Sequence, residues 1–458
     1  MFNKLEHIKQ IKIPVIRFGR PQSLCVQLSA WDIPNIEYLA ARFSNDYRRS
    51  KKQSPPEQLV DLYRVYDNEN NIPERLRQPV LGSDDAFRVI LGMTAEQFQY
   101  SNMVWIFERF NRNYYILLAG QNFEHRSEIS VNDIMNKTFG YAADDYIAIL
   151  LMVFWLCAQC PMPLTAPPHL YRRKEPTALT KENLTKFIAY YSCSYKELRE
   201  SSLGKQLLYA KPFIKTDRTK SFIISSMFLL AMLVGNGLYW VVRDYYKEKG
   251  QTFVNAFGRL FEDYIVDLAD TYCLPSELIR LKEGKNKRAD FLFVFENVQL
   301  LVEAKSSLLG LEGKQQVPNS NVIDKFFQST IQKAYRQLTT CYEEVATVKK
   351  PTLKVILLYD EFSNTAILEQ SIEGIFLNDS TCYIMTIREL EILLYAHRYD
   401  NQKFDEALHR LAFPEENSRG RKTVSSVLDT LSLNENYHFE GELDYFQKLM
   451  SYFENQLK

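Results

Sequence analysis

The chain has 458 residues, of which 46% are hydrophobic and 24% are charged. These are the proportions of an ordinary globular protein, and at roughly 100–200 residues per domain the length predicts two or three domains. Basic and acidic residues number 56 each, so the formal net charge is zero. This argues against a generic nucleic-acid coat protein, and any nucleic-acid contact would have to use a local basic patch.

The cysteines and the N-terminus bear on the cellular compartment. Seven cysteines, an odd number, are spread thinly from Cys25 to Cys382. This argues against a disulfide framework and favours a reducing compartment, so we expect a cytoplasmic protein. The first 20 residues mix charged and apolar side chains without a continuous apolar core. We therefore expect no secretory signal there.

The first 245 residues or so have the spacing of helices. Apolar residues recur at helical intervals over 36–49, 94–110, 131–159 and 181–202. Thr180 stands directly before the segment KENL (181–184), where a helix-capping residue is expected. Proline-containing stretches at 48–56 and 161–176 interrupt the pattern and indicate exposed loops. We predict a mainly α-helical domain over 1–245 that recognises a target, a partner or a trigger.

Two uncharged runs, 146–164 and 221–242, approach the ~20 residues that are needed to span a bilayer. The first ends in a proline-rich stretch, and the second is interrupted by Gly235, Asn236 and Gly237. Neither has the flanking charge pattern of a membrane span. Because a buried helix has the same composition, we expect core helices and keep a membrane-associated protein as the alternative.

The pattern changes after about residue 245. A helix is predicted over 254–270, then strands over 277–282, 290–295 and 298–305. A helix at 324–345, a strand at 353–359, a helix at 364–371, a strand at 381–386 and a helix at 388–397 follow. Only Glu296 and Asn297 separate the second and third strands, which predicts a hairpin. We expect an α/β domain with a mixed sheet over 246–412 and a helical tail over 413–458.

The chemistry-bearing residues lie on this hairpin. Asp290 opens one predicted strand, and Glu303 and Lys305 stand near the end of the next. Side chains two apart on a strand share a face, so Glu303 and Lys305 project together and the hairpin can bring Asp290 beside them. A Glu-x-Lys tripeptide alone is common, and an edge-strand ion pair would look the same. Its place after a strand that begins with aspartate makes it more specific.

Such a cluster suits phosphodiester hydrolysis. Two carboxylates hold Mg²⁺ through hard oxygen ligands, and the metal polarises the phosphoryl oxygen and acidifies a water molecule. A nearby ammonium group can orient that water or stabilise the developing charge. The residue types therefore predict a metal-dependent hydrolase.

About a third of the chain resembles the PD-(D/E)XK nuclease superfamily, whose members have a restriction-endonuclease-like α/β core. The matching motifs are FGRLFEDY (257–264), RAD (288–290), VEAK (302–305) and QKAYRQL (332–338). The predicted order helix, three strands, helix, strand is also that of many members. The sequence departs from the family pattern at Ala289, where proline is usual, and the resemblance does not extend to the N-terminal half.

The resemblance implies roles for particular residues. Asp290 and Glu303 would bind Mg²⁺ or Mn²⁺, Lys305 would be the catalytic lysine, and the carbonyl of Ala304 would be a further metal ligand. Glu262 matches an acidic residue that some members use as an extra ligand, although a surface glutamate on a helix is the alternative.

Two further features accompany the motif. Gln332 or Gln337 matches a helical glutamine of several branches, and either could equally be exposed to solvent. Lys285, Lys287 and Arg288 form a basic loop that could contact DNA phosphates or be an ordinary charged turn.

Other chemistries lack their motifs. The sequence contains no GxxxxGK[ST], GxSxG or HExxH motif, and we interpret its six scattered histidines as structural or surface residues. We therefore predict a DNA endonuclease, by analogy a bacterial restriction or anti-phage defence effector, with a protein partner or a second copy binding the helical half. The alternative is a non-catalytic nucleic-acid-binding or scaffold protein with a nuclease-like fold.

Overall fold

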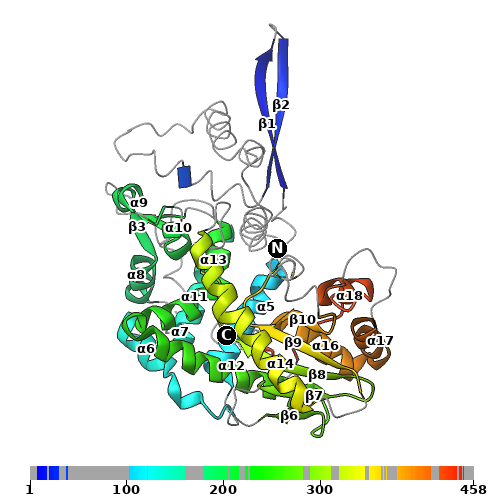
Figure 1. The fold of residues 1–458 in the computed structure, drawn as a ribbon. Helices are drawn as coiled ribbons and strands as arrows, with labels where there is room; N and C mark the ends of the chain where they lie inside the picture. Colours follow the sequence, from blue (N-terminus) through cyan, green and yellow to red (C-terminus); the bar gives the residue numbers. More distant parts are fainter. Residues whose placement is uncertain are drawn as a thin grey trace.

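The structure, a computed structural model, describes residues 8–17, 20–29, 38–39, 103–120, 122–159, 180–201, 203–204, 206–215, 222–224, 227–281, 289–310, 319–345, 350–362, 365, 368, 379–413, 422–440, 443–445 and 447. Within these residues the protein is a mixed helix-and-sheet structure, and its C-terminal part is built on a five-stranded mixed sheet (Figure 1).

The five-stranded sheet has the strand order β10-β9-β8-β7-β6. Its strands are β6 (Leu278–Arg280), β7 (Phe291–Val294), β8 (Gln299–Lys305), β9 (Thr352–Leu358) and β10 (Cys382–Thr386). Strands β6, β7 and β8 pair antiparallel, whereas β8, β9 and β10 pair parallel. Each matches a predicted strand to within two residues at either end, so the predicted mixed sheet and its hairpin are confirmed.

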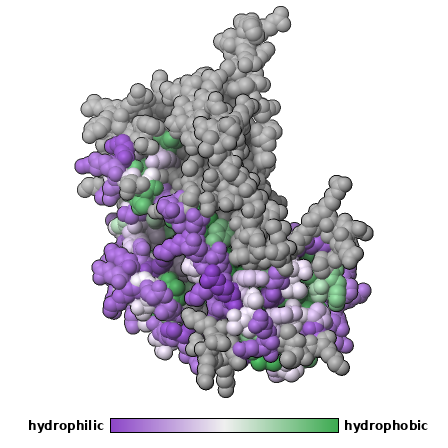
Figure 2. All heavy atoms as spheres, in the orientation of Figure 1, coloured by the Kyte–Doolittle hydropathy of each residue, from purple (hydrophilic) through white to green (hydrophobic). Residues whose placement is uncertain are grey.

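Helices cover both faces of this sheet (Figure 1). One face packs against α12 (Gly250–Tyr272), α16 (Ile387–Tyr399) and α17 (Asn401–Ala412). The other packs against the continuous helical segment α13 (Ser320–Phe326), η6 (Phe327–Gln332) and α14 (Lys333–Val345). All seven residues of β9 are buried, as expected for a central strand covered on both faces. Hydrophilic residues predominate where α13 and α14 face the viewer (Figure 2).

The N-terminal half contains helices and also strands that were not predicted. Its helices are α5 (Met103–Tyr114), η2 (Tyr115–Ala119), η3 (Arg126–Glu128), α6 (Val131–Phe139), α7 (Ala143–Gln159), α8 (Lys181–Tyr190), α9 (Tyr195–Glu200), α10 (Gln206–Ala210), α11 (Met227–Tyr245) and η5 (Lys247–Lys249). Strands β1 (Ile8–Arg17) and β2 (Arg20–Ser29) form an antiparallel hairpin. Strands β3 (Ser192–Ser194), β4 (Phe213–Lys215) and β5 (Phe222–Ile224) form a small mixed sheet.

Two predicted helices are each divided. The predicted helix over 131–159 breaks between α6 and α7, where Gly140 has a left-handed φ of 82° that glycine adopts readily. The predicted helix over 181–202 is interrupted by β3, after which Ser194 begins α9 with a capping box. The predicted helices at 36–49 and 364–371 lie almost entirely outside the described residues.

The described parts of the two apolar runs, residues 146–154 and 229–242, are mostly buried. Helices α7 and α11 contact each other, and α11 lies along α5. A methyl group at Gly237 would lie 2.7 Å from the hydroxyl oxygen of buried Tyr146, so the glycine allows the close approach of α11 and α7. No described helix combines the length and the apolar character that crossing a membrane requires.

Buried ion pairs join α5 to the C-terminal part. The Arg112 guanidinium donates to both carboxylate oxygens of Glu391 in α16, at 2.6 and 2.7 Å, and to Glu361 after β9 at 2.5 Å. Glu391 also accepts hydrogen bonds from Tyr264 and Tyr437. One hydrophobic cluster runs from Ile106 to Leu443, so the predicted boundary near residue 245 passes through a shared core.

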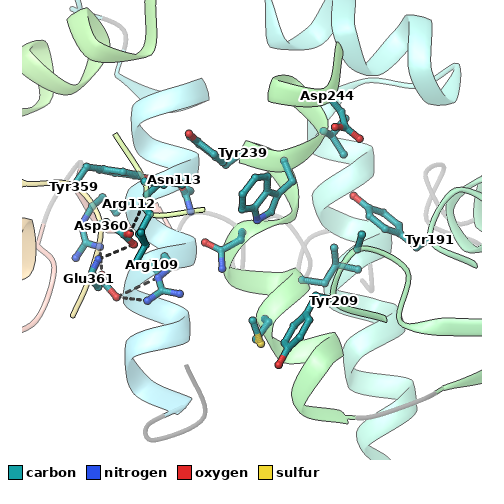
Figure 3. A pocket seen from close by; sticks show the side chains of 18 of the residues that line it. Arg109, Arg112, Asn113, Tyr191, Tyr209, Tyr239, Asp244, Tyr359, Asp360 and Glu361 are labelled. Carbon is teal, nitrogen blue, oxygen red and sulfur yellow. Dashed lines mark hydrogen bonds and ion pairs between the residues drawn. The ribbon is translucent and has the colours of Figure 1, made fainter. Parts of the chain in front are cut away.

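A cavity of about 170 Å³ lies between α5, α11 and the ends of β8 and β9 (Figure 3). In Figure 3, Arg109 and Arg112 converge on Glu361 at one side of it. Burial alone would raise the pKa of Glu361, but the two guanidinium groups lower that pKa to about 2. The cavity is formed where the helical half meets the sheet, and the predicted catalytic residues are not among those that line it.

Candidate active site

Asp290 and Glu303 face each other across strands β7 and β8. The register pairs Phe291 with Val302, which places Asp290 opposite Glu303 on the face of the sheet that α14 covers. The Asp290 amide donates to the carbonyl of Val302 at 3.0 Å, and the Ala304 amide donates to Asp290 Oδ2 at 2.8 Å. The predicted hairpin therefore brings the two acidic residues together.

Lys305 lies on the same face as Glu303, two residues along β8. Its ammonium group contacts Glu303 Oε1 and donates to Gln337 Oε1, in α14, at 3.3 Å. Glu303 is only 2% exposed, and its second oxygen, Oε2, has no hydrogen-bond partner among the residues that the structure describes. A buried carboxylate oxygen without a donor is costly, and a bound cation would satisfy it.

Glu262 approaches from α12. Gly258, one turn earlier in α12, lets the helix lie against the end of β8: a methyl group there would lie 3.3 Å from the hydroxyl oxygen of Ser306. Glu262 accepts from Arg280 at 3.3 Å, and its side chain is 30% exposed. It thus provides an acidic group between the buried site and the solvent.

Burial and neighbouring negative charge both raise the pKa values of these carboxyl groups. Burial, followed by repulsion from Asp290, raises the pKa of Glu262 to about 7. The same two causes raise the pKa of Glu303 to about 8, even though Lys305 acts in the opposite direction. Desolvation and the neighbouring charge therefore outweigh the ion pair. Such strongly shifted groups are common where a protein binds a cation or performs acid–base chemistry.

The residues fit a divalent ion by their chemistry. Carboxylate and carbonyl oxygens are the ligands that Mg²⁺ and Mn²⁺ prefer. Backbone groups alternate in direction along a strand, so the carbonyl of Ala304 points toward β7, as that of Val302 does. The side chains of Glu262, Asp290 and Glu303 do not all lie within 4.8 Å of one another in the described structure. A shared ion would have to draw them closer.

The remaining predicted site residues differ in their placement. Gln337 contacts Lys305, whereas Gln332 is the last residue of the π-helical segment η6 and lies five positions earlier. Five residues correspond to about 140° of rotation around an α-helix, so the two glutamines point in different directions. The basic residues Lys285, Lys287 and Arg288 lie outside the described part of the chain.

Two clusters of potential metal-ligating side chains were not predicted from the sequence, because every histidine was interpreted as a structural or surface residue. Within the described residues, Glu124, His125 and Asp263 form one group of ligand-type side chains, and Cys273, Glu277 and His397 form another. In the first group, His125 Nδ1 lies 3.1 Å from both Asp263 oxygens, and Arg280 donates to Glu124. His125 is 138 residues from Asp263 and His397 is 120 residues from Glu277, so no local motif signals these contacts.

The raised pKa values predict how stability depends on pH. Folding holds a proton on Glu303 and Glu262 more tightly than the unfolded chain does. This contribution is complete below the ordinary glutamate pKa of 4.5 and is lost as the pH rises through about 7 and 8. Without added metal, the melting temperature should therefore fall between pH 5.5 and 8.5.

This pH dependence can be assigned to Glu303 by differential scanning calorimetry. Glu303→Gln removes the titrating group, so the variant should lose less stability than the unchanged protein over the same pH range. Added Mg²⁺ should stabilise the unchanged protein more at pH 8.5 than at pH 5.5, because deprotonated carboxylates bind the ion. Parallel melting curves for the two proteins at every pH would contradict this assignment.

The chain was compared with protein-family models, curated proteins and solved structures. No family model, no curated protein and no solved structure matches the chain. The interpretation of this site therefore depends on its residues and their geometry.

Proposed function

We propose that the protein is a metal-dependent DNA endonuclease of the PD-(D/E)XK type. The observation that carries this proposal is the junction of β7 and β8, where Asp290, Glu303 and Lys305 meet on one face of the sheet. Two carboxylates and an ammonium group can supply the metal ligands and the hydrogen-bond donor of metal-dependent phosphodiester hydrolysis, and Glu262 and Gln337 adjoin them. The order of helix and strands around the site also agrees with the resemblance in the sequence.

Each residue has a role in this proposal. Asp290 and Glu303 bind Mg²⁺ or Mn²⁺, together with the carbonyl of Ala304, and Glu262 adds a further ligand directly or through water. The ion, when bound, would polarise a phosphoryl oxygen of the substrate and make a water molecule more acidic. Lys305 donates a hydrogen bond to the attacking water or to a non-bridging phosphate oxygen. Gln337 accepts from Lys305 and so keeps the ammonium group at the end of β8.

The substrate and the setting belong to the same proposal. We infer that DNA approaches over Glu262, whose side chain is 30% exposed, and that Lys285, Lys287 and Arg288 contact its phosphates. A role in restriction or anti-phage defence, a cytoplasmic location and a protein partner or second copy at the helical half remain predictions.

Cleavage assays test the proposed function. The purified full-length chain is incubated with supercoiled plasmid, linear duplex and single-stranded DNA, in Mg²⁺, in Mn²⁺ and with EDTA. We expect duplex cleavage that needs the divalent ion and stops with EDTA. DNA that is bound but never cut, with either metal and all three substrates, would support the non-catalytic alternative. An RNA substrate in parallel tests the choice of DNA.

The two glutamines provide a matched pair of variants. Gln337→Met should lower the cleavage rate about 10-fold, because Lys305 loses a hydrogen-bond acceptor and its position becomes less defined. Gln332→Met, in the same helical segment, should leave the rate within about 2-fold. Single-turnover rates at saturating metal measure both effects. A larger loss for Gln332→Met than for Gln337→Met would reverse the assignment.

A further inference from the structure

A second group of metal-ligating side chains lies away from the proposed nuclease site. Ligand atoms of Cys273, Glu277 and His397 lie within 4.8 Å of one another. Cys273 follows the last residue of α12, Glu277 precedes β6, and His397 is in the last turn of α16. Cys273 is 11 residues beyond Glu262 in sequence, which is about 16 Å along the helix. The two groups therefore form separate sites.

The hydrogen bonds of His397 leave a place for a cation. Asn401 donates through Nδ2 to Asp405 at 3.2 Å, which directs its Oδ1 toward His397 Nδ1 at 3.1 Å. Nδ1 of His397 therefore carries the proton that it donates, and in a neutral ring Nε2 has only a lone pair. Nε2 faces Glu277 Oε2 at 2.9 Å. Two acceptors at this distance repel each other unless a cation joins them, either a proton on Nε2 or, after a small separation, a metal ion bound to both.

The ligands are held in place by their surroundings. The His397 ring packs against Phe295 and Phe404, with centroids 5.0 and 4.6 Å away. Glu277 Oε2 accepts from the Leu274 amide at 2.7 Å, which fixes the position of this carboxylate. A histidine whose second nitrogen is fixed by a hydrogen bond, as Asn401 fixes His397, is typical of metal sites in proteins.

We propose that Cys273, Glu277 and His397 bind one Zn²⁺ ion. Sulfur, nitrogen and carboxylate oxygen are all zinc ligands, and a thiol selects zinc over the hard ions Mg²⁺ and Mn²⁺. Bonds of about 2.0–2.3 Å in a tetrahedron separate the ligand atoms by about 3.3–3.7 Å, which requires only small shifts here. Binding releases the thiol proton of Cys273 to solvent, and a water molecule completes the coordination.

The site would join the end of α12 to α16. The carbonyl of Glu277 also accepts from the amide of Val294 in β7, so the ion would fix the edge of the five-stranded sheet. Zinc should therefore stabilise the folded protein, because it binds the folded arrangement of three distant residues. The Glu124, His125 and Asp263 group is a weaker candidate because it has no sulfur and Arg280 already supplies a positive charge.

Cobalt substitution tests this proposal through the sulfur ligand. Metal-free full-length protein is titrated with Co²⁺, whose thiolate charge-transfer band in the near ultraviolet appears only when sulfur is bound. We expect the band to saturate at one equivalent, to disappear in Cys273→Ser and to weaken in His397→Gln. Zn²⁺ should abolish the band and raise the melting temperature of the unchanged protein but not that of Cys273→Ser.

Two control variants separate this site from the others. Glu303→Gln alters the proposed nuclease site and His125→Gln alters the other histidine group, and both should retain the cobalt band. Circular dichroism checks that each variant is folded. If Cys273→Ser does not fold, the strength of the cobalt band in His397→Gln tests the proposal instead. The absence of a thiolate band in the unchanged protein would overturn the proposal, as would a band of full strength in Cys273→Ser.

Discussion

Replacement of Lys305 by methionine is expected to lower the DNA-cleavage rate at least about 100- to 1,000-fold, the usual loss when one transition-state donor is removed. Methionine keeps the length of the aliphatic chain but cannot donate a hydrogen bond or carry charge. The Lys305 ammonium group lies between Glu303 and Gln337 at the end of β8, so its removal leaves the negative charge on the phosphate unopposed on that side. Single-turnover cleavage of plasmid DNA measures the loss.

The control for this variant is Lys325→Met on α13, an exposed lysine in the helical segment that covers the same face of the sheet. It should cut DNA at the unchanged rate. Thermal melting checks that Lys305→Met remains folded, since the Lys305 side chain is partly exposed and lies at the end of a strand. Cleavage by Lys305→Met at more than a tenth of the normal rate would refute the assigned role.

Replacement of Arg112 by methionine is expected to cost about 3–5 kcal/mol of unfolding free energy. The Arg112 side chain is 1% exposed, and its partners Glu361 and Glu391 are 4% and 0% exposed. Removing the guanidinium leaves Glu391 without its only charged partner among the described residues. Since α5 and α16 meet through this pair, the loss should weaken the junction between the two halves of the chain.

Chemical denaturation measures the effect of Arg112→Met, and Arg410→Met is its control. Arg410 pairs with Glu406 one turn earlier in α17, but both side chains are substantially exposed, so its loss should cost less than about 1 kcal/mol. Arg112→Met combined with Glu391→Met should recover part of the stability, because no buried charge is then left alone at that position. A loss below about 1 kcal/mol for Arg112→Met would show that the network does not support the core.

The sheet could be predicted because its strands carry their own signals. Buried strands such as β9 are short and continuously apolar, and Glu296 with Asn297 marks the turn between β7 and β8. The positions of Asp290, Glu303 and Lys305 follow from strand periodicity once these strands are known. The pairing of Asp290 with Glu303 depends on the register, which the short turn defines.

Features that depend on distant contacts or on changes of helix type were not predictable. The choice between Gln332 and Gln337 depends on the π-helical segment η6, which shifts the phase of the helix. The Arg112–Glu391 pair joins residues 279 positions apart, and the Cys273, Glu277 and His397 group spans 125 residues. By contrast, the β1–β2 hairpin was missed although Ile11, Ile13 and Val15 alternate with polar or small residues. That signal was available in the sequence.

The most direct measurement is a crystal structure of the full-length protein with Mn²⁺ and duplex DNA, in which anomalous scattering locates the metal. We predict a manganese peak about 2.0–2.4 Å from carboxylate oxygens of Asp290 and Glu303, with a DNA phosphate on the same ion and Lys305 beside it. Ordered DNA with no manganese near Asp290 and Glu303, or with its backbone held elsewhere on the protein, would contradict this assignment.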